Sequence, residues 1–104
     1  MTTNRETGVV DVDELTPGSV IDVETKSRHY QIECLGGHEI RISGHPDYCP
    51  QPTRAQLHGS INREGEWDAS HIGQGSRMMF FLNDRPVTTS RIVSLHVQNP
   101  ARVH

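Results

Sequence analysis

The apolar positions of this chain recur at every second residue over several short stretches, which is the period of a half-buried β-strand. The alternation is clearest over residues 28–35 and 38–43. The same-face apolar positions of these two stretches are Tyr30, Ile32, Cys34, Ile40 and Ile42. The pair Gly36-Gly37 between them is typical of a tight hairpin turn. Together with a strand at 19–24, they predict a meander of three antiparallel strands.

Three further strands are expected at 55–61, 76–82 and 87–97. Alternation assigns to the interior Leu57, Gly59, Ile61, Met78, Phe80, Leu82, Val93, Leu95 and Val97. It leaves on the outer faces His58, Ser60, Met79, Phe81 and Ile92. The last strand is long enough to bend or bulge and so serve two sheets, which is how small barrels close.

The predicted fold class is all-β: a single small antiparallel barrel or strongly bent sheet of about six strands, with two long loops. The loops are residues 44–54 and 62–75, and three prolines exclude a helix from the first of them. No stretch of ten or more residues has a 3.6-residue apolar period, so no substantial helix is expected.

Turn and loop signals divide the chain into three parts. Residues 1–16 are polar and predict a flexible N-terminal arm, with one short turn at 12–15. Residues 17–98 are expected to form the barrel domain. Residues 99–104 are expected to fray.

Composition narrows the classes of function. A length of 104 residues suits one domain, and a formal net charge of −3 argues against a general nucleic-acid binder. The N-terminus has no apolar signal region, and no apolar run has membrane-spanning length. The expected location is the cytoplasm, without membrane contact.

Seven histidines and two cysteines raise a metal hypothesis. Cys34-x3-His38 and His45-x3-Cys49 can be written as a mirrored pair, and zinc takes four nitrogen or sulfur ligands. These spacings are looser than a C-x2-C knuckle, and alternation places Cys34 inside the sheet. A Cys/His metal-binding protein is therefore the rival class, whereas the favoured interpretation has no metal and no cofactor.

A second hypothesis makes Cys49 a nucleophile activated by His45. A reactive cysteine needs its pKa lowered by a histidine, a cation or a helix N-terminus, and no helix is expected here. The alternative is a proline-rich loop that packs Tyr48 against the barrel. No catalytic residue is assigned, and a non-enzymatic role is favoured.

Trp67, the single tryptophan, lies in the second long loop close to His71. It is either a recognition anchor or a cap that buries its ring over an open end of the barrel. We favour the cap, because a chain with 33% hydrophobic residues has few large apolar side chains to spare. A small-ligand or enzyme site at the barrel mouth near Trp67 and His71 is a further alternative.

Met79 and Phe81 alternate with interior residues and should project outward, where Ile92 would extend them into an apolar patch. Such a patch must be buried by something. Either the N-terminal arm covers it, or it binds a second copy of the chain or another protein. The favoured function is accordingly a non-enzymatic protein-interaction module, with a homo-oligomer as one outcome.

Several segments of the chain resemble a group of short bacterial proteins with which no activity is associated. They are Pro17-Gly-Ser-Val-Ile, His29-Tyr-Gln-Ile, Ile42-Ser-Gly, Pro50-Gln-Pro-Thr, Leu57-His-Gly-Ser, Ile72-Gly-Gln-Gly-Ser-Arg-Met and Thr89-Ser-Arg-Ile-Val-Ser-Leu. A fainter likeness links Gly59, Ile72, Gly75 and the two last strands to the β-barrel domain of translation factors. It implies an architecture and no function.

Overall fold

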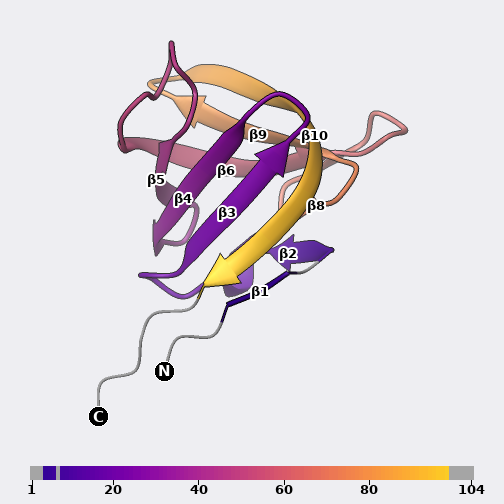
Figure 1. Ribbon diagram of the computed structural model, residues 1–104, viewed down its shortest axis with the longest axis horizontal. Helices are drawn as coiled ribbons and strands as arrows, with labels where there is room; N and C mark the ends of the chain where they lie inside the picture. Colours follow the sequence, from indigo (N-terminus) through magenta and orange to yellow (C-terminus); the bar gives the residue numbers. More distant parts are fainter. Residues whose placement is uncertain (1–3, 7, 99–104) are drawn as a thin grey trace.

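The computed structural model describes residues 4–6 and 8–98, and its regular structure is almost entirely β (Figure 1). The strands are β1 (Asn4–Glu6), β2 (Val9–Asp11), β3 (Val20–Thr25), β4 (His29–Gly36), β5 (Glu39–Ser43), β6 (Thr53–Ile61), β7 (Trp67–Asp68), β8 (His71–Gly73), β9 (Arg77–Leu82) and β10 (Arg85–Gln98). A 3₁₀ turn, η1 (Val12–Glu14), follows β2. The predicted all-β class is confirmed.

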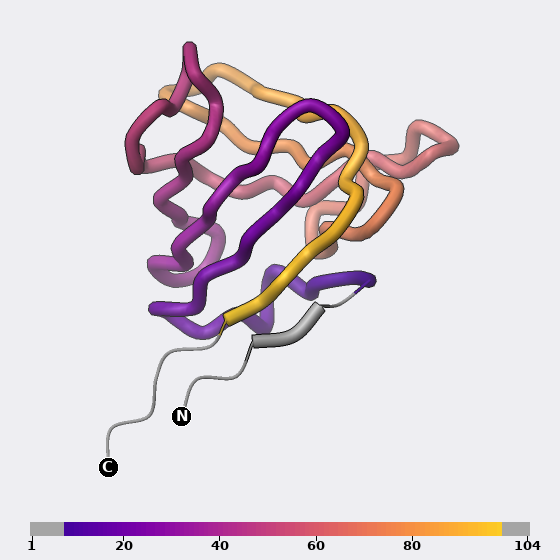
Figure 2. The backbone as a smooth tube through the Cα atoms, viewed as in Figure 1, coloured from indigo at the N-terminus to yellow at the C-terminus, as the bar shows by residue number. Residues whose placement is uncertain are grey.

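Six strands of the main antiparallel sheet ring round one core. Strands β3, β4, β5 and β6 pair in chain order, β6 also pairs with β9, and β9 pairs with β10. The second half of β10 then returns to pair with β3. Figure 2 shows this path: the orange start of β10 crosses the top of the molecule, and its yellow end runs down beside β3. The expectation that the long last strand serves two parts of the sheet is confirmed.

The interior of the ring holds the residues that alternation assigned to it on three strands, β4, β5 and β9. They are Tyr30, Ile32, Cys34, Ile40, Ile42, Met78, Phe80 and Leu82, all buried. Period-two patterning predicted these strands correctly because each one faces the core on one side only. The predicted strand bounds agree with the observed ones to within two residues.

In β10, the predicted assignment of side chains to faces is wrong at Ile92 and Val93, whereas Leu95 is buried as predicted. Ile92, expected outside, is only 3% exposed, whereas Val93, expected inside, is 45% exposed. The strand register shifts between Thr88 and Arg91, and again between Ile92 and Ser94. A β-bulge inserts one extra residue and moves the following side chains to the opposite face. The first shift brings Ile92 inside, and the second returns Leu95 to the face that alternation predicted.

Strand β6 shows the same effect at Gly59, where the register with β9 shifts. Ser60, expected outside, is buried, and its hydroxyl donates a hydrogen bond to the His71 carbonyl oxygen at 2.6 Å. Gly59 has a φ of +86°, and a Cβ there would collide with the carbonyl oxygen of Asp68 in β7. Only glycine satisfies both conditions.

The N-terminal segment takes part in the fold. Strand β2 pairs with β8, β1 pairs with the end of β10, and Val10 and Val12 are buried. The short turn expected at 12–15 is η1. The arm expected at 1–16 therefore has regular structure over much of its described length, and its strand partners are not β9. The expected fraying of residues 99–104 lies outside the described residues.

Gly59→Ala should lower the free energy of unfolding by about 2–4 kcal/mol, because it combines left-handed backbone strain with a steric clash. The measurement is urea unfolding followed by circular dichroism. Gly65→Ala is the matched control: its φ is +85°, but nothing lies within 4 Å of the new Cβ. That variant should lose only the backbone contribution, about 1 kcal/mol. Equal losses in the two variants would show that the approach of β7 does not depend on Gly59.

Candidate functional site

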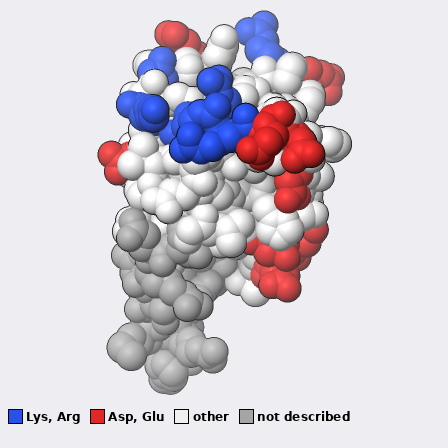
Figure 3. Space-filling view, turned by 90° about the vertical axis from the view of Figure 1, so that its right-hand side faces the viewer, with Lys and Arg blue, Asp and Glu red and all other residues white. Residues whose placement is uncertain are grey.

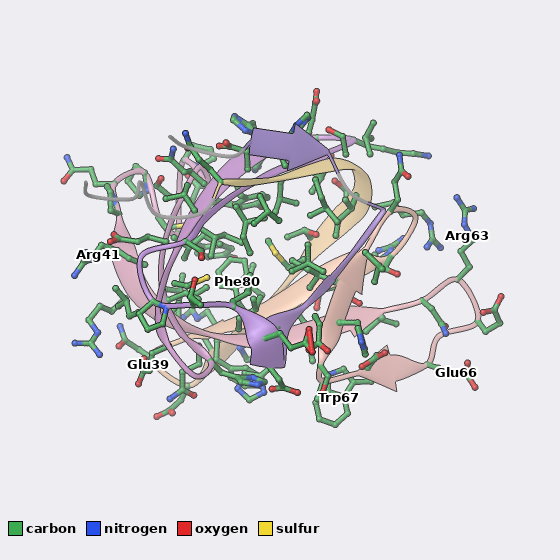
Figure 4. All side chains as sticks on the ribbon, turned by 90° about the horizontal axis from the view of Figure 1, so that it is seen from below. Glu39, Arg41, Arg63, Glu66, Trp67 and Phe80 are labelled. Carbon is green, nitrogen blue, oxygen red and sulfur yellow. The ribbon has the colours of Figure 1, made fainter. Side chains whose placement is uncertain are left out.

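Trp67 begins β7, the two-residue strand that pairs with the end of β6. Its side chain is 58% exposed, and its indole Nε1–H donates a hydrogen bond to the carbonyl oxygen of His58 at 2.6 Å. Figure 4 shows Trp67 at the periphery, whereas Phe80 lies inside the ring. The favoured interpretation of Trp67 as a buried cap is wrong, because β7 stands at an edge of the sheet and not over an open end.

An aromatic surface extends from Trp67 toward β9. The ring of His58 lies 4.4 Å from that of Phe81, centroid to centroid. Phe81 is half-buried, as is Met79 two residues earlier on the same outward side of β9. We call Trp67, His58 and Phe81 the aromatic face. It includes two predicted site residues, Trp67 and Phe81; Ile92, the third member of the expected patch, points into the core.

A hollow of about 220 Å³ lies beside Phe81. The residues around it are Glu39, Arg54, Ala55, Gln56, Phe81, Asn83 and Asp84. Glu39 and Arg54 face each other at 3.8 Å across one side of the hollow. The turn Asn83-Asp84 has positive φ at both positions, as a type I′ hairpin turn requires. The aromatic face is thus bordered by a polar depression.

His71 lies close to two carboxylates. Its Nδ1 lies 3.0 Å from an Asp68 carboxylate oxygen, and its Nε2 lies 3.8 Å from Asp11 of β2. These contacts join the β7–β8 segment to the N-terminal segment. They give His71 a structural environment, and the cavities beside Tyr48, Phe81 and Val20 are lined by neither Trp67 nor His71.

His38 makes a second connection to the N-terminal segment. Its Nε2 lies 2.7 Å from Asp13 Oδ1, and its Nδ1 lies 2.8 Å from the Leu57 carbonyl oxygen. Both partners only accept hydrogen bonds, so the doubly protonated imidazolium satisfies both. The hydrogen bond to Asp13 raises the pKa of His38, and the same bond lowers the pKa of Asp13. Both ring nitrogens of this candidate metal ligand are therefore engaged.

The candidate cysteines are buried thiols. Burial raises the pKa of Cys34 to about 11, and burial also raises the pKa of Cys49. Both thiols are free, and the backbone N–H of Cys49 donates to the His45 carbonyl oxygen at 3.0 Å. Among the described residues, no group of three or more histidine, cysteine or acidic side chains has the arrangement of a metal site. A raised pKa also disfavours the thiolate that nucleophilic catalysis needs.

Three arginines come together around Gly75. Arg77 of β9 lies directly opposite Arg91 of β10, and Arg91 Nη1 donates to the Gly75 carbonyl oxygen at 2.9 Å. The Arg63 guanidinium covers Gly75: its Nε would lie 3.3 Å from a Cβ added there. Among the described side chains, no carboxylate forms an ion pair with any of the three. Figure 3 shows a face of the molecule on which basic side chains gather in one area, with acidic ones next to them.

Tyr48 lies in the loop between β5 and β6 and is exposed. Its ring lies 4.4 Å from that of His45, and the Arg85 guanidinium stands 5.9 Å from its centroid. Tyr48 borders a cavity of about 320 Å³ between this loop, the β3–β4 turn and the first half of β10. Alternation along the chain could not indicate this cavity, because its walls come from segments distant in the sequence.

The His38–Asp13 contact should make stability depend on pH. A raised folded-state pKa for His38 gives stabilisation that is complete below the ordinary histidine pKa of 6.5 and is lost as the pH rises through the raised value. A lowered pKa for Asp13 gives stabilisation that is complete above the ordinary aspartate pKa of 3.8 and is lost as the pH falls. The contact is therefore strongest between pH 3.8 and pH 6.5.

The measurement compares melting temperatures of wild type and His38→Gln between about pH 5 and about pH 8.5. The melting temperature of wild type should fall more steeply across this range. Asp13→Asn should flatten the profile in the same way, since it removes the other half of the pair. Parallel profiles for wild type and both variants would mean that the contact contributes nothing.

Arg77→Glu should raise the free energy of unfolding by about 0.5–1 kcal/mol, because an opposite-charge pair replaces two like charges directly across the strands. Arg54→Glu is the control: it makes the same change in net charge but places a carboxylate beside Glu39. It should lower stability. Chemical denaturation at low ionic strength measures both. Shifts of the same sign would mean that net charge, and not the Arg77–Arg91 pair, decides the effect.

Comparison with known proteins finds no relative of this chain. No family model, curated protein or solved structure matches the chain. The resemblance to short bacterial proteins therefore stays a prediction from the sequence. Within the described residues, no helix has the length and apolar character needed to cross a membrane.

Proposed function

We propose that this domain is a non-enzymatic protein-interaction module whose aromatic face binds a short peptide segment of another protein. The observation that supports this most directly is the position of Trp67. It is 58% exposed although it is the only tryptophan in the chain, and its indole hydrogen bond to His58 fixes its orientation. Tryptophan is enriched among residues that dominate binding energy, and a ring held in place loses little entropy on binding.

Packing supports the same interpretation. The Trp67 indole bonds to the His58 backbone, and the His58 ring packs on Phe81, so the three residues are neighbours across β7, β6 and β9. The polar hollow beside Phe81 adds a rim that contains hydrogen-bonding groups. An apolar centre with a polar rim is the usual composition of a protein interface.

The size of the aromatic face favours a peptide over a second copy of the chain. An aromatic side chain buries at most about 150–250 Å², so three of them fall short of the ~800 Å² per partner of a standard interface. A short extended segment with one or two apolar side chains fits a surface of this size. Self-association through Met79 and Phe81 is then an outcome of the experiment and not the proposal.

The experiment selects binders from a displayed library of random linear peptides. We expect wild type to enrich peptides that share an apolar position and to bind the synthesised peptides with a change in Trp67 fluorescence. Trp67→Ala should weaken binding about tenfold or more, as truncation of an anchor residue does. Phe81→Ala should weaken it as well.

Val93→Ala is the matched control, because Val93 is an exposed apolar residue on β10 outside the aromatic face. It should bind as wild type does. Selection of no peptide, or of peptides whose affinity is unaffected by Trp67→Ala, would refute the proposal. Light scattering provides the other arm: a concentration-dependent dimer that Phe81→Glu abolishes would identify a second copy as the partner instead.

A further inference from the structure

A cavity at one end of the ring, which we call the mouth, shares no residue with the aromatic face. It is the cavity of about 320 Å³ bordered by the β3–β4 turn, the 44–52 loop and the first half of β10. This volume is at the lower end of the range for small-molecule sites. The chemical groups on its walls therefore decide what it can hold.

Tyr30 supplies the first specific group. Its side chain is only 2% exposed, and its ring packs edge-on against Phe80 with centroids 6.1 Å apart. Within the described structure its hydroxyl has no hydrogen-bond partner, yet it is not among buried atoms closed off from solvent. The hydroxyl is therefore the part of Tyr30 that opens into the cavity. Burial raises the pKa of Tyr30, so the group stays a donor at neutral pH.

Arg28 supplies the second specific group, a positive charge. The cavity wall includes Arg28 and contains no aspartate or glutamate among the described residues. Arg85 stands close by, over Tyr48. Among the described side chains, neither arginine forms an ion pair. An uncompensated guanidinium beside a buried hydroxyl donor favours an anion.

Further donors come from the loop and from β10. His45 Nδ1 accepts hydrogen bonds from the backbone N–H groups of Asp47 and Tyr48, at 3.1 and 3.3 Å. Because Nδ1 accepts, the ring proton lies on Nε2, which becomes a donor. Thr88 and Ser90 add hydroxyl groups, and Pro86 and Val87 add a small apolar area.

The loop that carries His45 and Tyr48 is built into the fold. Gly44 has a φ of +129°, and a Cβ there would collide with the His29 carbonyl oxygen. The N–H of Gly44 donates to the Cys49 carbonyl oxygen at 2.9 Å, which closes the base of the loop over the buried Cys49. A site held in this way loses little free energy to ordering when a ligand binds.

We propose that this cavity binds a small organic anion, either a carboxylate or a phosphate ester. The charged group of the anion contacts Arg28 and the Tyr30 hydroxyl. Its short carbon skeleton lies against Pro86 and Val87. The two headgroups share the chemistry that the donors recognise. The proposal is independent of peptide binding at Trp67, since the two surfaces share no residue.

The experiment titrates ¹⁵N-labelled protein with inorganic phosphate, glycerol 3-phosphate, succinate and, as a neutral comparison, glycerol, all at constant ionic strength. We expect saturable shifts at residues 27–30, 45–49 and 86–90 with at least one anion and none with glycerol. The ligand class that binds more tightly, phosphate ester or carboxylate, identifies the headgroup that the cavity prefers. Tyr30→Phe and Arg28→Gln should each weaken binding about tenfold, as loss of a charge-assisted hydrogen bond does.

Arg63→Gln is the matched control, because it removes an unpaired arginine outside the cavity, and it should leave the affinity unchanged. Thr88→Val, at an exposed position, keeps the test valid should Tyr30→Phe disturb the core, and it should weaken binding as well. The proposal is overturned by non-saturable shifts with every anion, or by equal losses in Arg28→Gln and Arg63→Gln, which mean an adventitious ion only. Trp67→Ala should not affect this binding, so failure here is distinguishable from failure of the peptide proposal.

Discussion

The fold depends on one strand, β10, pairing with two different partners. Its first half bonds to β9 and its second half to β3, and this double pairing leaves the six-stranded ring without an open gap. A strand can turn this sharply only where bulges interrupt the ladder. Between the two pairing segments side chains replace the missing backbone bonds: Thr89 Oγ1 accepts from the N–H of Met78 at 3.0 Å, and Ser90 Oγ accepts from that of Ser27 at 3.2 Å. Closure of the ring therefore places hydroxyl groups at its mouth.

The same bulges explain what the sequence could and could not predict. Alternation correctly placed residues such as Ile32 and Phe80, because an unbroken strand keeps its period of two. It failed at Ile92 and Ser60, each of which lies beyond a bulge. In β10 the buried positions Thr89, Ile92 and Leu95 are three residues apart. A spacing of three inside a strand indicates an inserted residue. The sequence does not reveal this spacing, because Thr89 is polar and the exposed Val93 is apolar.

The candidate sites were harder to predict because they depend on contacts between distant segments. The exposure of Trp67 follows from the close approach of β7 to β6, which Gly59 permits by lacking a Cβ. Composition favoured burial of the only tryptophan, and the position of an edge strand decided otherwise. The cavity at Tyr30 joins segments as far apart in the chain as Ser27 and Ser90. For Tyr30 the alternating pattern identified a buried ring but not the open side of its hydroxyl.

The net charge of the whole chain does not describe the charge of its individual surfaces. A value of −3 argues against a surface that binds polyanions, yet positive charge is concentrated locally at Arg28 and in the cluster around Gly75. Solvent-exposed charges more than about 8–10 Å apart are largely screened at physiological ionic strength. The cavity wall contains Arg28 and, among the described residues, no aspartate or glutamate, whereas Asp11 and Asp13 contact histidines. A net negative charge is therefore compatible with the proposed binding of an anion, because the residues of the cavity wall, and not the total charge, set the charge of the cavity.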